Sequence, residues 1–464
     1  MVTHSPLKTG LTRGATAMLF FGFAFAVMAD PVSSVAYAVE AALRALDGHL
    51  EDLFPAMALV IGVVCLVTIN YWYLVRRFPQ GGGDAEAAGR AFGTAWAFPV
   101  IGALIVDFVL TIAISISAAS SAIIAYIPSL LDLRIPLAIA LCALVAGLTL
   151  FGHGGRVLFA TFTISFLAMA VIVIVKGYLS PFAVLPESAV RITGEPMSPA
   201  IVAILFAFPV AMALATGIEA PLTSIAQLGQ LDDDGKRRFG RGTLVLTVGI
   251  VGCITLALTG LAIKLNVGIP EEGSTQMADI ARVATGEGTV FALFQLASSI
   301  LLLAAASSSY QAGPGLLKAL ARTDAGHGLG LLPRSLGHAN KHHTPYWSVA
   351  VYLGISCLVI VAARAEEQEL VLFYAVAVFA SFLMGLAAMA RFSWLEGNRP
   401  LLAINVVAGI AVLFTLLINL ARGYPLVSFA AVLLIAAGLH RAWVRAGRPE
   451  GVTELERHAE EDDY

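Results

Sequence analysis

Charged residues are scarce in this chain of 464 amino acids, of which 13% are Asp, Glu, Lys or Arg and 58% are hydrophobic. Soluble domains carry about 25% charged residues, and the mean hydropathy here is +0.85, so the composition argues against a soluble enzyme. The four cysteines share no close spacing, which argues against a metal or redox site. No glycine-rich phosphate-binding loop occurs. We therefore expect no enzyme activity and no cofactor, and an ion gradient as the energy source.

The sequence contains long apolar runs in place of charged segments. A bilayer core about 30 Å thick requires roughly 20 apolar residues per helix. By this rule the candidate spans are residues 15–38, 53–75, 97–127, 136–151, 157–178, 200–228, 243–265, 289–317, 346–363, 370–391, 401–420 and 426–443. We predict an all-α membrane protein with twelve transmembrane helices.

The placement of basic residues supports this count. With the amino terminus inside, 20 of the 28 Lys and Arg residues fall in inner segments and the other 8 in outer segments. This bias is expected of an even number of spans with both termini in the cytoplasm. We predict a multi-pass protein of the cytoplasmic (inner or plasma) membrane. The lipid bilayer is then its surroundings, we expect no nucleic-acid partner, and the sequence leaves the oligomeric state open.

Two short runs interrupt otherwise apolar spans. One contains Asp30 followed by Pro31, and the other is Thr216-Gly217-Ile218-Glu219. A carboxylate at the centre of a spanning helix costs roughly 3 kcal/mol, which is tolerated where it faces a polar cavity or an ion path. Paired discontinuous segments in the two halves of a chain point to a transporter's substrate site. We predict a secondary transporter with its site around Asp30 and Glu219.

The two interruptions also suggest an internal repeat. Spans one to five can be laid over spans six to ten, because each set opens with an interrupted helix beside a carboxylate. This predicts an inverted five-helix repeat with two helices added. The expected divisions are a cytoplasmic amino terminus at 1–14, repeats at 15–178 and 200–391, two additional helices at 401–443 and a disordered cytoplasmic tail at 444–464.

Each candidate residue also has a structural interpretation. Asp30 can cap a helix that begins with Pro31, and Glu219 can form a salt bridge between helices. Deep carboxylates nevertheless need a partner, and burial disfavours their charged form, so we expect Asp30 or Glu219 to carry a proton or bind a cation. Gly217 can adopt a backbone conformation that leaves carbonyl groups pointing inward.

Span three carries a polar face of its own. Asp107, Thr111 and Ser115 are four residues apart, so they share one side of a helix. Ser and Thr in membrane helices can instead bond their own backbone carbonyls, and Asp107 can anchor a neighbouring helix. Tyr37 and Tyr374 are either interfacial anchors or part of the same site.

Several segments resemble the amino acid–polyamine–organocation superfamily, which has the LeuT-type fold with broken helices 1 and 6. Pro79-Gln80-Gly81-Gly82 resembles its cytoplasmic Pro-x-Gly-Gly turn, and Ser309-Tyr310-Gln311-Ala312-Gly313-Pro314 resembles the end of its eighth helix. The resemblance covers residues 10 to 445.

Within the superfamily the chain is most similar to KimA-type potassium–proton symporters. The matching runs are Asp30 with Ser33-Ser34-Val35-Ala36-Tyr37, Asp107-Phe108-Val109-Leu110-Thr111 with Ser115, Thr216-Gly217-Ile218-Glu219-Ala220, and Tyr374-Ala375-Val376-Ala377-Val378-Phe379. The resemblance implies a potassium site formed by Asp30, Tyr37, Thr111, Ser115, Thr216, Glu219 and Tyr374, with Asp107, Phe108 and Gly217 in support. Phe108 stands where those symporters have a tyrosine of the ion site, so one oxygen is missing.

Proton-coupled potassium uptake is the leading functional hypothesis, with Asp30 or Glu219 carrying the proton. The alternative is a proton-coupled permease for amino acids or amines. Amino acid members usually break the first helix with a Gly-Ser-Gly-type run whose bare amides receive the substrate carboxylate. Here Ala29-Asp30-Pro31-Val32 occupies that position, and its carboxylate would repel an anion. A channel or a non-transporting sensor has less support, because the chain carries an internal repeat of interrupted helices.

Overall fold

A computed structural model of the chain describes residues 13–151, 156–195, 199–228, 231–321, 328–423 and 425–454. Within these ranges the chain folds into α-helices and short 3-10 helices, with isolated β-bridges in place of strands. The all-α class predicted from the sequence is confirmed. Residues 1–12 of the predicted amino-terminal segment and 455–464 of the predicted tail lie outside the described residues.

Apolar segments account for most of the helices. The α-helices are α1 Arg13–Val27, α2 Ala29–Ser33, α3 Val35–Ala45, α4 Leu53–Arg77, α5 Gly83–Phe92, α6 Ala97–Tyr126, α7 Arg134–Leu150, α8 Arg156–Leu179, α9 Ala200–Ala211, α10 Ala220–Thr223, α11 Asp233–Leu265, α12 Gln276–Thr285, α13 Thr289–Leu320, α14 Tyr346–Ala362, α15 Glu367–Leu395, α16 Arg399–Ala421 and α17 Leu426–Arg445. The 3-10 helices are η1 Leu50–Asp52, η2 Thr94–Trp96, η3 Pro128–Leu133, η4 Glu187–Ala189, η5 Met212–Ala215, η6 Ser224–Gln227, η7 Arg334–Gly337 and η8 Val452–Glu454.

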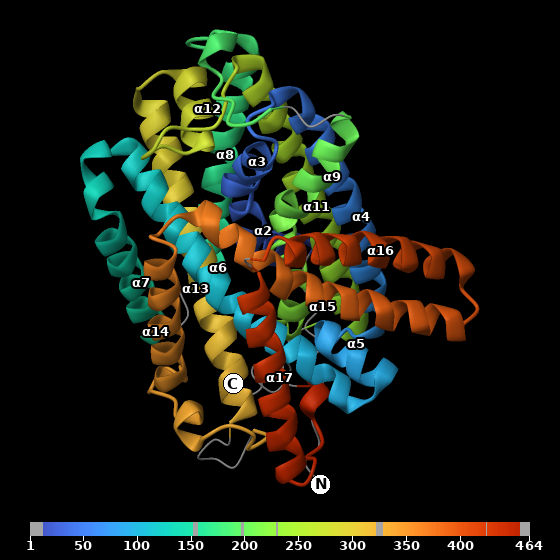
Figure 1. Cartoon of the computed structure of the whole chain (residues 1–464). Coiled ribbons are helices and arrows are strands. Elements are labelled where there is room, and N and C mark those ends of the chain that lie inside the picture. The colour runs from blue at the N-terminus through green and yellow to red at the C-terminus, as the bar shows by residue number, and fades with distance from the viewer. Residues whose placement is uncertain are drawn as a thin grey trace.

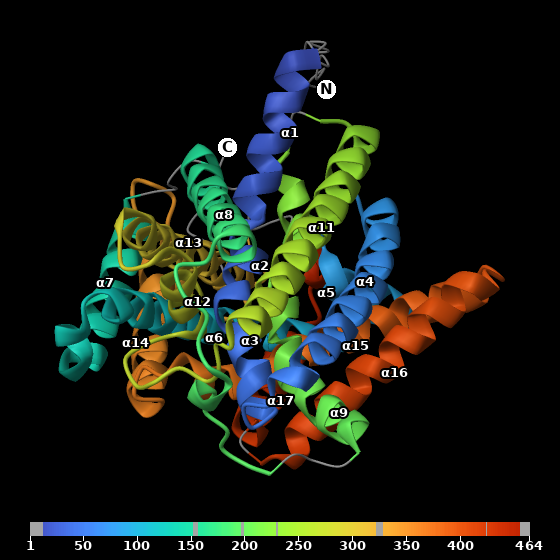
Figure 2. The same ribbon diagram turned by 90° about the horizontal axis from the view of Figure 1, so that it is seen from above.

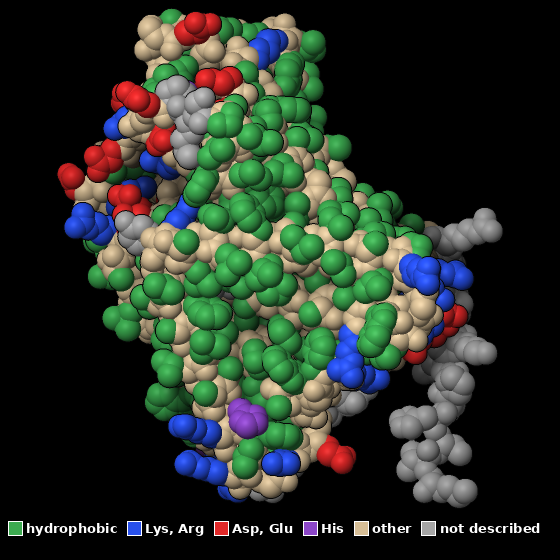
Figure 3. Space-filling model, turned by 45° about the vertical axis from the view of Figure 1, so that its right-hand side comes forward, with side chains coloured by type: hydrophobic (Ala, Val, Ile, Leu, Met, Phe, Trp, Pro, Cys, Tyr) green, Lys and Arg blue, Asp and Glu red, His purple; other side chains and the backbone are tan. Residues whose placement is uncertain are grey.

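Every predicted span coincides with helical structure. Ten helices among the described residues are long and apolar enough to cross a membrane, while the first and ninth predicted spans correspond to the shorter apolar helices Thr16–Val27 and Tyr346–Ala362. By length and composition, ten of the twelve predicted membrane spans are therefore confirmed among the described residues. On the face in Figure 3, apolar side chains cover the middle and charged ones gather at its margins. Leu358 and Leu434 are 71% and 73% exposed, which suits contact with lipid rather than with water.

Two short amphipathic helices reveal the relation between the halves. Helix α5 follows the second span and α12 follows the seventh, and Figure 1 places α5 near the lower end of the molecule and α12 at the upper end. Equivalent helices at opposite ends are what an inverted repeat produces. The third and eighth spans, α6 and α13, pack against each other along their length.

The interrupted helices lie inside this bundle. Seen from above in Figure 2, α2 and α3 are central, with α7 and α14 toward one edge and α16 toward the other. Helix α2 packs against α13, and α3 packs against α9. Tight packing of alanine and other small residues, such as Ala211 and Ala306 at 0% exposure, brings these helices close together.

Candidate functional site

The sixth span is openly broken at the predicted position. Helix α9 ends at Ala211 and continues as the 3-10 helix η5, after which Thr216 takes a non-helical ψ of 132°. Gly217 has a φ of +73°, a conformation that suits glycine because it lacks a Cβ. Glu219 then precedes α10 as its N-cap residue. The Thr-Gly pair thus ends one helical segment and sets the direction of the next.

The first span is interrupted more mildly. It is divided into α1, α2 and α3 at Met28 and Ser34, yet both residues keep right-handed helical torsions. Pro31 lacks an N–H and so removes one helical hydrogen bond. Asp30 lies in the first turn of α2, whose N-cap residue is Met28, with no capping side-chain bond. Asp30 therefore does not act as the cap of α2, which was its alternative structural role.

A serine joins the two interrupted spans. The Ser34 hydroxyl lies 2.7 Å from the carbonyl oxygen of Pro31 and 3.2 Å from that of Leu214 in η5. Ser34 is fully buried, so these carbonyls have little access to water. The contact fixes the first break against the sixth, which places Asp30 beside Gly217.

The break brings the predicted carboxylates together. A Cβ on Gly217 would lie 2.8 Å from Cγ and Oδ2 of Asp30, so the glycine leaves room for that carboxylate. Asp107 interacts electrostatically with Asp30, and Glu219 interacts with both. Three segments distant in sequence, α2, α6 and the sixth-span break, therefore converge on one acidic site.

Hydroxyl groups surround these carboxylates. Tyr37 lies within reach of Thr216 and Asp30, and Tyr374 lies beside Asp107 and interacts with Glu219. The Thr216 hydroxyl donates to the carbonyl of Ala213 at 2.6 Å, which leaves its oxygen lone pairs free to face a cation.

The polar face of α6 contributes unevenly. Thr111 lies next to Asp107, whereas Ser115 is buried one turn farther along the same face. Phe108 is half-buried and packs against the apolar clusters, so its predicted place in the cavity stays a prediction. A buried tyrosine that sequence reasoning missed, Tyr352 of α14, interacts with Asp107.

The site is short of positive charge. Asp30, Asp107 and Glu219 each have one carboxylate oxygen without a hydrogen-bond partner, and no ion pair in the described ranges joins any of them to Lys or Arg. The salt-bridge alternative for Glu219 is thus not found there. Burying an ionised carboxylate without a partner is very costly. Each must therefore gain a proton or a cation.

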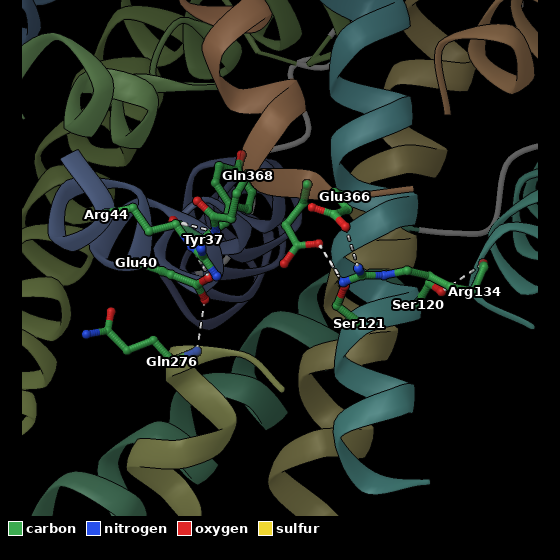
Figure 4. Close-up of polar contacts among 10 residues, drawn as sticks. Tyr37, Glu40, Arg44, Ser120, Ser121, Arg134, Gln276, Glu366 and Gln368 are labelled. Atoms are coloured by element: carbon green, nitrogen blue, oxygen red, sulfur yellow. Dashed lines mark hydrogen bonds and ion pairs between the residues drawn. The ribbon is translucent and has the colours of Figure 1, made fainter. Parts of the chain in front are cut away.

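An ion-pair network covers the site on the α12 side (Figure 4). Glu40 on α3 accepts from the Arg44 guanidinium at 2.8 Å and from the backbone N–H of Gln276 at 2.9 Å. A hollow of about 190 Å³ is lined by Glu40 and Arg44 and also by Arg134 and Glu367. The Arg134 guanidinium lies 3.8 Å from the Glu367 carboxylate, which accepts a hydrogen bond from the Ser121 hydroxyl at 2.7 Å.

The network also touches the site directly. The Gln368 side chain donates to the backbone carbonyl of Tyr37 at 3.4 Å, and Tyr37 is itself a predicted site residue. Sequence reasoning missed this network, because Arg134 and Glu367 belong to segments more than 200 residues apart. The sequence offered one indication of this network, which is that Arg134 and Glu367 are charged residues at the starts of apolar spans.

Comparison with known proteins defines the class as a membrane transporter of the secondary type. The family model described as "Amino acid permease" matches residues 18–436. The chain belongs to this family, which is part of the amino acid–polyamine–organocation superfamily.

Individual known proteins are also similar to the chain. The chain is similar to the potassium transporter KimA of Bacillus subtilis (strain 168), with 25% identity over 376 residues, covering 79% of this chain and 60% of that protein. Among solved structures, a mutant manganese transporter of Eremococcus coleocola gives a TM-score of 0.48 at 12% identity, covering 96% of this chain and 98% of that one. The same transporter with an aromatic bis-isothiourea substituted compound gives 0.49 at 11%, covering 96% and 97%. These scores are too low to compare the sites residue by residue.

Proposed function

We propose that this protein is a proton-coupled potassium uptake system of the cytoplasmic membrane, with both termini in the cytoplasm. The observation that carries the proposal is the acidic site itself. Asp107 is buried, Asp30 and Glu219 are partly buried, and each has one buried carboxylate oxygen with no hydrogen-bond partner and no basic side chain paired to it among the described residues. Such a site is completed by small cations and protons rather than by an anionic group.

The surrounding oxygens favour a hard cation, and the spacing of the carboxylates favours a monovalent one. Hydroxyl groups of Tyr37, Thr216 and Tyr374 adjoin the carboxylates, and oxygen ligands suit hard cations. Within the described ranges, no three Asp, Glu, His or Cys side chains converge closely enough to hold a metal ion, which disfavours a divalent ion held by clustered carboxylates. The similarity to a potassium transporter supports the same choice.

Coupling follows from competition for the carboxylates. A proton on Asp30 or Glu219 removes one negative charge, and a potassium ion nearby disfavours that proton. We assign the ion site to Asp30, Tyr37, Thr111, Ser115, Thr216, Glu219 and Tyr374, with Asp107, Phe108 and Gly217 in support. This opposition makes the occupancy of the site by one cation depend on the other, and so couples the two ions.

The second candidate function is a proton-coupled permease for amino acids or amines, which the description of the matching family favours. The first span gives it less support. Met28 and Ser34 are helical, and the N–H groups of Met28 and Val32 bond to Ala24 and Met28 at 2.9 and 3.0 Å. Few bare amides are therefore left there to receive a substrate carboxylate.

Uptake by reconstituted vesicles separates the two functions. With an acidic exterior and an alkaline interior, we expect the protein to accumulate labelled rubidium, and a protonophore to abolish this accumulation. Labelled amino acids serve as the competing probe in identical vesicles. Proton-driven amino acid accumulation without rubidium accumulation would overturn the potassium proposal and support the permease.

A further inference from the structure

A further buried carboxylate lies outside the site and outside the ion-pair network. Asp84 occupies the first turn of α5 and is 6% exposed. Helix α5 packs against α15 and α6, both of which contribute residues to the acidic site. The ion ligands proposed above leave Asp84 without a role, although a carboxylate is costly to bury.

The carboxylate of Asp84 is held in place by two other spans. The Tyr71 hydroxyl of α4 donates to Oδ2 of Asp84 at 2.9 Å, and the Ser381 hydroxyl of α15 donates to the same oxygen at 3.2 Å. A Cβ on Gly385 would lie 1.9 Å from Oδ1. Glycine at that position therefore allows the carboxylate to enter between the helices.

One face of α15 connects Asp84 with the site. Ser381 follows Tyr374 by seven residues, which is close to two full turns and a rise of about 10 Å along the helix. Tyr374 adjoins Asp107 and Glu219. Glu219 in turn interacts electrostatically with Asp84, so the two carboxylates belong to one polar region.

The amino-terminal end of α5 borders solvent close to Asp84. A surface hollow of about 90 Å³ is lined partly by Gly82 and Glu86, each two residues from Asp84 in the chain. Charged and titratable groups around α5 include Glu86 with its ion pair Arg90, Tyr71 of α4, Glu219, Arg77 at the hollow, and Arg391 of α15, which lies over the Phe92 ring.

We propose that Asp84 is the proton relay between Glu219 and the solution at the α5 end. In the step, the O–H bond of the Glu219 carboxyl breaks and an O–H bond forms on a carboxylate oxygen of Asp84, directly or through water. Asp84 then releases the proton to water at the hollow, and both carboxylates end ionised. The inference rests on the proposed proton coupling, and it adds an exit route that the ion ligands do not provide.

The test compares two rates in vesicles that hold a pH-sensitive dye. One rate is proton release accompanying rubidium uptake under a pH gradient, and the other is rubidium exchange at equal pH, which needs no net proton movement. We expect Asp84→Asn to slow proton-coupled uptake by about tenfold or more while exchange persists. The matched control is Asp279→Asn on α12, the equivalent helix of the second half, whose carboxylate pairs with Arg282 at 2.6 Å. It is expected to change neither rate by more than about twofold.

The outcomes separate this inference from the proposed function. Equal loss of both rates in Asp84→Asn, or no loss in either, overturns the relay. If that variant fails to assemble, Gly385→Ala displaces the same carboxylate and is judged by the same two rates. A wild-type protein that moves protons with labelled alanine but not with rubidium refutes potassium coupling alone, and the Asp84 comparison is then decided with alanine. No proton movement with either substrate overturns both proposals.

Discussion

Replacing Gly217 with alanine tests the geometry of the sixth-span break. Its φ of +73° is one that residues with a Cβ adopt at a cost, and the added methyl group would lie 2.8 Å from the Asp30 carboxylate and 2.9 Å from Cδ of Pro31. The substitution therefore strains the backbone and displaces Asp30 at once. Both effects act on the same few atoms of the proposed site.

The size of the effect follows from these two terms. The left-handed conformation costs a residue with a side chain about 1–2 kcal/mol, and overpacking a tight interior costs about 1–3 kcal/mol. We expect Gly217→Ala to lower the free energy of unfolding by about 2–5 kcal/mol in total. In an Asp30→Ala background the clash with the carboxylate is removed, so the loss should shrink, and the strain term and the contact with Pro31 remain.

The assay is denaturant unfolding in lipid micelles, followed by the fluorescence of the five tryptophans. Gly249→Ala in α11 is the matched control, because a Cβ there meets nothing within 4 Å. A helical glycine replaced by alanine should gain about 0.5–1 kcal/mol. Equal stability of Gly217→Ala and Gly249→Ala would refute the positive φ and the close approach of Asp30.

Two further predictions concern contacts around the site. Arg134→Gln leaves Glu367, which is 4% exposed, without its counter-charge, and should lower the free energy of unfolding by about 3–5 kcal/mol. Asp234→Asn removes an exposed pair with Arg237 and should cost less than about 1 kcal/mol; similar losses in both variants would contradict the buried network. Ser34→Ala removes the contact with Leu214 between the interrupted spans and should cost about 1–3 kcal/mol. Ser165 faces outward and its hydroxyl bonds a carbonyl of its own helix, so Ser165→Ala should leave the free energy of unfolding nearly unchanged. A larger loss of stability in Ser165→Ala than in Ser34→Ala would contradict this account.

The helices could be predicted from the sequence because each span must satisfy its backbone within a long apolar run. The open break at Thr216 and Gly217 was also predictable from the sequence, because a polar side chain and a glycine interrupt an apolar run there. The first break is milder than predicted. Pro31 occupies the first turn of α2, where its missing N–H disturbs little, so the helical torsions continue through Met28 and Ser34.

The amphipathic helices α5 and α12 were not predicted. Residues 83–92 mix Asp84, Glu86 and Arg90 with alanine over a length that is too short to span a membrane, so they look like a polar turn in sequence. The helical form of α5 depends on packing against α15 and α6, and that of α12 on packing against α8 and α13, which is tertiary information. The role inferred for Asp84 was hidden for the same reason.

The paired interruptions predicted that Asp30 and Glu219 share a site, whereas the place of Asp107 beside them was predictable only through the resemblance to a known family. Apolar run lengths locate each carboxylate along its own helix and give no information on which helices meet. Tyr352 belongs to a span that carries no charged residue, and the structure alone places it beside Asp107. Local pattern therefore determines the elements here, and packing between distant spans determines the site.

The central claim is that Asp30 and Glu219 bind the proton and the transported cation in one buried site. The most direct measurement is proton-driven uptake of labelled rubidium by vesicles containing the wild-type protein, Asp30→Asn or Glu219→Gln, with rubidium exchange at equal pH measured in parallel. Each substitution keeps the shape of the side chain and removes its titration. The account predicts that replacing the proton carrier abolishes proton-driven accumulation, and that exchange of bound rubidium continues. Unchanged proton-driven accumulation in both variants would contradict it.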